Sequence, residues 1–236
     1  MGHIVSSVAR YWQKRRQMRL IGISNAIFGI TGASGYTKKW ADGHTLELTS
    51  STAEARKIKE TDLNDLATEA CGDHKDQFSF AIMHSNVAKT LENLQLLEYW
   101  RQTDANGIQR PMALGSVNGY TVIVDDGVPV EKVGGDGANK DLAKYTTYLF
   151  GSGVIRTARG RVDVPVETVR DAKKNGGQDE LIIRMRETIH PNGFSFKIPS
   201  SGWTESPTDA QLFAKANWDI KFDPKALPIA RLITNG

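Results

Sequence analysis

The sequence predicts an α+β fold, in which helices and strands are both present but do not alternate regularly. Segments with apolar side chains at helical spacing lie mainly in the first half of the chain. Short segments rich in β-branched and aromatic residues dominate the second half. Because the helices are separated by strands that follow no repeating pattern, an α+β class is favoured. At 236 residues, the chain is long enough for one or two domains with a hydrophobic core.

Three helices are predicted in the first half, over residues 4–30, 53–71 and 85–100. Gly72 provides a C-terminal stop for the second helix, and Ser85 provides an N-terminal cap for the third. The segment between the first two helices, residues 29–43, is rich in Gly, Ser and Thr and is predicted to be a loop.

Strands are predicted over residues 78–83, 119–124, 145–150, 154–155, 218–222 and 229–233. A hairpin is predicted between residues 164–171 and 181–189, because Asn175-Gly176-Gly177 form a turn between them. A short helix over residues 206–216 begins at either Ser206 or Thr208. Residues 103–107 are predicted to form a turn, and residues 133–140 a glycine-rich loop.

Composition excludes several classes of protein. The longest apolar runs, such as residues 20–23, are far too short to span a bilayer, so no membrane contact is predicted. Basic residues stand where the apolar core of a signal peptide should be. Cys71 is the single cysteine, which excludes an intrachain disulfide and a cysteine-rich metal site. A net charge of +3 does not indicate a dedicated nucleic-acid binder.

Basic residues of the first helix allow two interpretations. Arg10, Lys14, Arg16 or Arg19 would lie on its exposed face, and the simpler interpretation is a solvated surface. The alternative is a face that attracts phosphates through charge alone. The simpler interpretation is favoured.

Candidate reactive residues do not form a recognisable site. Asp125 and Asp126 follow a strand and could ligate a metal ion, but adjacent strand residues point to opposite faces. The simpler interpretation is that both carboxylates accept hydrogen bonds from the turn at Gly127. His84 is likewise predicted to bond the adjacent turn rather than to act in catalysis. No catalytic, cofactor-binding or metal-ligating residue is predicted, and no cofactor.

The order of motifs along the chain resembles one family. Within residues 78–129, a strand ending in Met83-His84-Ser85 leads into a helix, and a second strand ends in Asp125-Asp126 before Gly127-Val128-Pro129. Together with residues 7–17, 61–73, 145–153, 167–171, 189–194 and 227–232, this ordered set resembles the major capsid (coat) proteins of tailed phages, with the Hong Kong 97-type fold. Each motif is weak alone, and the ordered set is the more specific signal.

The resemblance implies an axial domain and part of a peripheral domain. Residues 1–48 would form a spine-like helix and loop that remain from the peripheral domain. Residues 49–160 would form the axial domain, and residues 161–236 the return hairpin and closing strands of the peripheral domain. Family members carry further N-terminal segments, so the chain is expected to be truncated relative to them.

The function implied is that of a structural subunit, not an enzyme, in the icosahedral capsid of a tailed phage or prophage. The partners would be other copies of the chain in pentamers and hexamers, with scaffold and portal proteins, and weak non-specific DNA contact on the inner face. It would be found in the virion capsid, and in the host cytoplasm during assembly. Loops at residues 103–111 and 134–139 are the candidate interface segments. The alternatives are an encapsulin-type shell protein and a metal-dependent enzyme using Asp125 or Asp126.

Overall fold

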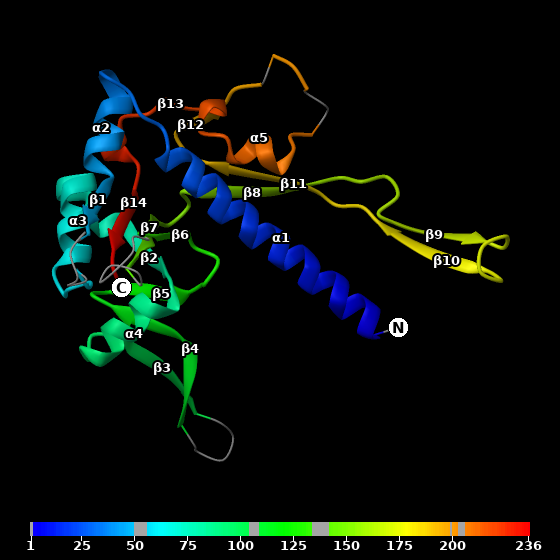
Figure 1. Cartoon of the computed structure of the whole chain (residues 1–236), viewed down its shortest axis with the longest axis horizontal. Coiled ribbons are helices and arrows are strands. Elements are labelled where there is room, and N and C mark those ends of the chain that lie inside the picture. The colour runs from blue at the N-terminus through cyan, green and yellow to red at the C-terminus, as the bar shows by residue number, and fades with distance from the viewer. Residues whose placement is uncertain (1, 50–55, 104–108, 134–141, 199, 203–205) are drawn as a thin grey trace.

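The computed structural model describes residues 2–49, 56–103, 109–133, 142–198, 200–202 and 206–236. Its helices are α1 (Gly2–Phe28), α2 (Gly35–Gly43), α3 (Asp62–Cys71), α4 (Ser85–Asn93) and α5 (Asp209–Phe213), with 3₁₀ turns at Gly72–Gln77, Lys215–Asn217 and Pro224–Ala226. Helices and strands are mixed along the chain, which confirms the predicted α+β class (Figure 1).

Eight of the described strands form one mixed sheet, in the order β1 (Thr45–Leu48), β14 (Ile229–Thr234), β7 (Ala143–Gly151), β2 (Phe78–Met83), β5 (Tyr120–Val124), β4 (Gln109–Val117) and β3 (Glu98–Thr103), with β6 (Val130–Lys132) paired to β7. The β1–β14 and β2–β5 pairs are parallel, and the other neighbours are antiparallel. β1 lies in residues 1–48 and β14 in residues 161–236, which were expected to belong to the peripheral domain. Strands that are distant in sequence therefore share one sheet and its core.

Two hydrophobic clusters cover the two faces of this sheet. Strand residues alternate between the faces, so Leu149 of β7 and Ala230 of β14 belong to the cluster under α3 and α4. Their neighbours Tyr148 and Ile229 belong to the other cluster, under α2 and the C-terminal end of α1. The compact body is therefore a sheet between two helical layers.

A series of stacked aromatic rings packs α1 and α2 against the sheet face that carries Tyr148. Tyr148 stacks on Phe28, Phe28 on Trp40, and Trp40 on His44, with ring centroids 5.6, 5.2 and 4.4 Å apart. The guanidinium of Arg231 lies 5.0 Å from the centre of the Phe28 ring and donates a hydrogen bond of 3.5 Å to the Phe28 carbonyl. A cation is favourable at that position because the carbonyls at a helix C-terminus are partly negative.

The smaller strands form structures outside the main sheet. β8 (Ile155–Gly160) pairs with β11 (Arg186–Pro191), and β12 (Phe194–Phe196) pairs with β13 (Trp218–Ile220). β9 (Val166–Asp171) and β10 (Gln178–Ile183) form a separate antiparallel hairpin. Figure 1 shows that the β8–β11 ribbon leads away from the body and that the β9–β10 hairpin lies beyond it. We call the β9–β10 hairpin the arm.

Several predicted boundaries were wrong. Residues 35–43 are helical although they were predicted to form a loop, because Trp40 is buried among aromatic side chains and stabilises α2. The second helix begins at Asp62 rather than at residue 53, although residues 50–55 lie outside the described part. The predicted second strand of the hairpin, residues 181–189, is divided between β10 and β11, which pair with different partners.

The third helix ends at Asn93 rather than at Trp100. Gln95 has φ 57°, the left-handed conformation that terminates helices. The Leu96 N–H donates to the Leu91 carbonyl, and the Gln95 N–H to the Glu92 carbonyl, at 3.0 and 2.9 Å. This Schellman arrangement releases the following residues to form β3.

Candidate functional site

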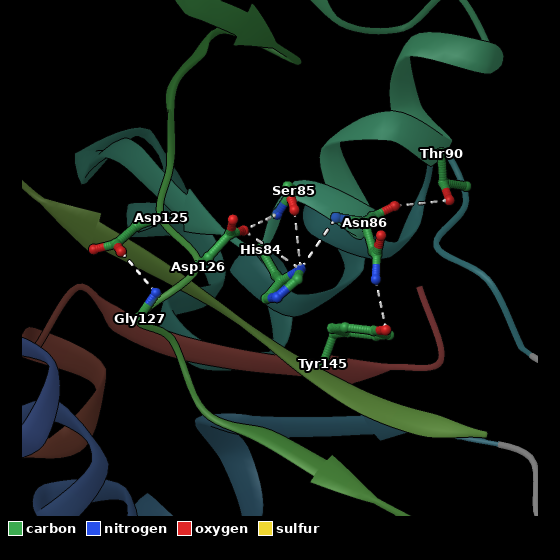
Figure 2. A network of polar contacts seen from close by, with 8 residues as sticks. All are labelled: His84, Ser85, Asn86, Thr90, Asp125, Asp126, Gly127 and Tyr145. Carbon is green, nitrogen blue, oxygen red and sulfur yellow. Dashed lines mark hydrogen bonds and ion pairs between the residues drawn. The ribbon is translucent and has the colours of Figure 1, made fainter. Parts of the chain in front are cut away.

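The carboxylates of Asp125 and Asp126 serve different neighbours. The Gly127 N–H donates to Oδ1 of Asp125 at 2.8 Å, and the Gln17 side chain donates to its Oδ2 at 2.5 Å. Asp126 instead accepts a hydrogen bond of 3.0 Å from the Ser85 N–H, at the start of α4. Figure 2 shows Asp125 directed to Gly127 and Asp126 directed to Ser85. The turn at Gly127 therefore binds only Asp125, and the prediction for Asp126 was wrong.

His84, not Ser85, caps α4. Its Nδ1 accepts a hydrogen bond from the Asn86 N–H at 3.1 Å, so the prediction that His84 bonds the adjacent turn is confirmed (Figure 2). The same Nδ1 lies 3.6 Å from Oδ1 of Asp126. Hydrogen bonds from Ser85, with a smaller contribution from His84, lower the pKa of Asp126. Asp126 thus remains a carboxylate beside the positive end of the α4 dipole.

This network connects three elements of the body. Asp126 follows β5, His84 and Asn86 begin α4, and the Asn86 side chain donates a hydrogen bond of 2.6 Å to the Tyr145 hydroxyl on β7 (Figure 2). Within the described residues, no group of three or more His, Cys, Asp and Glu side chains is placed to hold a metal ion. The contacts therefore fit a structural joint, and they do not favour a metal-dependent enzyme.

Basic residues of α1 form ion pairs within the molecule. Arg15 and Arg19 both contact Asp209 at the start of α5, at 2.8 and 2.9 Å. Arg16 contacts Glu187 of β11 at 2.6 Å, and the Glu187 side chain is almost fully buried. A solvated face was therefore the wrong interpretation for Arg16 and Arg19. Their role is to hold α1 against α5 and β11.

The arm has two different faces. Cross-strand neighbours share a face, so Val166, Thr168 and Arg170 lie on the same side as Ile183, Leu181 and Asp179. Val166 and Leu181 are 58% and 46% exposed. The opposite face carries Glu167, Val169, Asp171, Gln178, Glu180 and Ile182. Three of the six residues on the first face are apolar, against two of six on the opposite face, which also carries three carboxylates. The arm is therefore weakly amphipathic, and no other described strand pairs with it.

The predicted interface loops are only partly described. Thr103 and residues 109–111 belong to strands β3 and β4, and the intervening residues 104–108 lie outside the described part. The loop at residues 134–139 also lies outside it. The arm was missed as a candidate surface, although the predicted hairpin mixes apolar residues such as Val166 and Leu181 with charged ones.

Comparisons with known proteins point to a capsid. No protein-family model matches the sequence. A major capsid protein of Bacillus phage SPP1 is 32% identical over 98% of this chain. The chain spans 64% of the length of that relative. Among the described residues, no helix is long and apolar enough to cross a membrane. The chain is therefore a relative, along nearly its whole length, of a phage major capsid protein, and its resemblance to the coat proteins of tailed phages is confirmed.

Proposed function

We propose that the protein is a structural, non-enzymatic subunit of an icosahedral phage capsid and assembles with copies of itself. The observation that carries the proposal is the 32% identity to a phage major capsid protein along 98% of the chain. That relative favours a capsid over an encapsulin-type compartment. The protein would be located in the virion capsid, after assembly in the host cytoplasm.

The proposed fold is of the Hong Kong 97 type. The compact body would be the axial domain, although its sheet includes β1 and β14, which lie outside the expected residues 49–160. Helix α1, β11 and the arm fall in the peripheral segments expected over residues 1–48 and 161–236, whereas β8 falls within the axial bounds. The arm supports this assignment. A two-stranded hairpin is marginally stable in water without further packing, so an arm that lies away from the core is suited to pack against another subunit of a shell.

Assembly into pentamers and hexamers would use contacts that are individually modest but act together in a closed shell. Scaffold and portal proteins are further proposed partners. Weak contact with DNA on the inner face would use Arg10 and Lys14, which have no acidic partner among the described residues. Such contact would be non-specific and would weaken steeply with salt.

Electron microscopy and sedimentation of the purified protein, expressed from its gene, test the proposal. We expect rings or closed shells that form above a threshold protein concentration. A protein that stays monomeric at every concentration, although circular dichroism shows that it is folded, would contradict the proposed self-assembly.

A further inference from the structure

The arm presents an apolar face that nothing in the described chain covers. Leu181 and Val166 lie on this face with Ile183, and its formal charges, Arg170 and Asp179, form an ion pair of 3.2 Å. The opposite face also has two apolar residues, Val169 and Ile182, but it carries three carboxylates as well, those of Glu167, Asp171 and Glu180. The face with Leu181 is therefore the one suited to contact with an apolar surface, which the described part of this chain does not provide.

A second uncovered apolar surface lies on the main sheet. Phe80 of β2 and Ile123 of β5 are 40% and 38% exposed although they lie in interior strands. They line a hollow of about 280 Å³ together with Leu20 of α1 and Ile155 of β8. Large apolar side chains exposed together on a sheet face commonly mark an interaction surface.

The two surfaces match in charge. The hollow at Phe80 has no charged side chain in its lining, whereas four other hollows on the described part of the chain each include at least one. The apolar face of the arm also carries no net charge, because Arg170 and Asp179 neutralise each other. The Arg170–Asp179 pair lies at the turn end of this face, two positions from Leu181, where it can stay at the solvated edge of a contact. The hollow adds no further ion that docking would desolvate.

Within one molecule the two surfaces do not meet. The hollow includes Ile155, at the start of the ribbon, and the arm lies beyond the far end of that ribbon (Figure 1). A six-residue strand such as β8 extends about 20 Å, at roughly 3.3 Å per residue. The arm is directed away from the body, so the described part of the same molecule does not reach this face (Figure 1).

We propose that the apolar face of the arm, centred on Leu181, docks into the hollow between Phe80 and Ile123 of a second copy of this chain. The proposal rests on the proposed self-assembly and specifies which two surfaces meet. Because donor and acceptor lie on different parts of the chain, the contact is heterologous. Repetition from copy to copy can therefore close into a ring.

Disulfide trapping between two variants tests this contact. One variant carries Leu181→Cys and the other Ile123→Cys, and the two are mixed before assembly under mild oxidation. The native thiol does not compete, because burial raises the pKa of Cys71 to about 11 and thiolate is the reactive form. We expect a covalent dimer that contains one copy of each variant and forms only on assembly.

Glu180→Cys provides the matched control, since residue 180 is adjacent in sequence and lies on the opposite face of the arm. Mixed with Ile123→Cys, it should give at least tenfold less dimer. Equal yields from both mixtures, or assembled particles without the Leu181–Ile123 dimer, would overturn the docking while leaving self-assembly intact. Absence of any assembly in the unmodified protein would remove the proposed function and this inference together.

Leu181→Asp gives an independent measurement that needs no crosslink. It should raise the concentration needed for assembly at least tenfold, whereas Glu180→Gln should leave it unchanged. Circular dichroism and sedimentation of the dissociated chain establish that both variants remain folded. An unchanged threshold for folded Leu181→Asp would count against the docking.

Discussion

The compact body and the arm both contain antiparallel strands, but they place leucine side chains in opposite environments. Leu149 of β7 is fully buried between sheet and helices, whereas Leu181 of β10 is 46% exposed on a hairpin with no third strand. Leu149 stands between Tyr148 and Phe150, which are buried on the other face of the sheet, whereas Leu181 stands between Glu180 and Ile182 on the hairpin. Within one chain, the stability of the body comes from its own core, whereas the arm lacks comparable packing.

The largest expected difference comes from truncating these two leucines. Leu149→Ala should lower the free energy of unfolding by about 2–5 kcal/mol, because it leaves a cavity in a packed core. Leu181→Ala in the same assembly-free chain should change it by no more than about 0.5 kcal/mol. Urea denaturation of the dissociated protein measures both. Equal losses would mean that the arm is packed in the isolated molecule, contrary to the comparison.

The cap of α4 tests a polar joint of the body. His84→Ala should cost about 1 kcal/mol, within the range of 0.5–2 kcal/mol for lost N-terminal caps, because the Asn86 N–H loses its acceptor. His84→Asn is the control, since an amide oxygen can accept the same hydrogen bond. Thermal unfolding should place His84→Asn closer to the unmodified protein than His84→Ala. The reverse order would show that the ring acts through packing against Tyr145 instead.

Removal of the ion pairs between α1 and α5 should lower the free energy of unfolding less than removal of the α4 cap. Asp209→Asn removes the negative charge that Arg15 and Arg19 share and one of the two oxygens that they contact. Partly exposed ion pairs contribute up to about 1 kcal/mol each. Asp163→Asn is matched to it, because Asp163 pairs with Arg161 where both side chains are almost fully exposed, and should have no measurable effect. Hydrogen exchange along α1 should rise in the first variant only. Unchanged exchange would indicate that apolar contacts alone hold the helix.

The last expected effect is a dependence on pH. Burial lowers the pKa of His44 from 6.5, and its Nδ1–H donates to the Ile229 carbonyl at 2.7 Å. Below pH 6.5 the unfolded chain binds a proton that the folded chain does not, so stability falls as the pH falls toward the folded pKa. Burial shifts His190 in the same direction. His44→Gln should reduce the slope of stability against pH below 6.5, measured by denaturation at several pH values. An identical slope would assign the effect to other groups.

Local signals in the sequence predicted the elements that local chemistry determines. The strand at β2, the turn before β10 and the start of α5 were all visible, and Thr208 caps α5 in a capping box with Gln211. The choice between Ser206 and Thr208 required the structure, because both residue types suit a cap.

Features that depend on distant partners were not predictable. Arg16 and Arg19 carry no local sign that Glu187 and Asp209 will meet them, because these acids are more than 150 residues away. Helix α2 has a loop-like composition, and the burial of Trp40 against Phe28 stabilises it. The apolar stripe of α4 continues in the sequence through Leu97, yet the left-handed Gln95 ends the helix first. Tertiary contacts thus override local propensity at each of these positions.

The position of β14 has a consequence for biosynthesis. This strand inserts between β1 and β7, so the sheet that spans the body cannot close until residues 229–234 have left the ribosome. Until then, β1 has no neighbour, and the apolar edge of β7 is open to solvent. Contacts between such distant segments slow folding and expose unpaired strands to aggregation. Nascent chains of this protein therefore have a period of vulnerability during which a chaperone would be of most use.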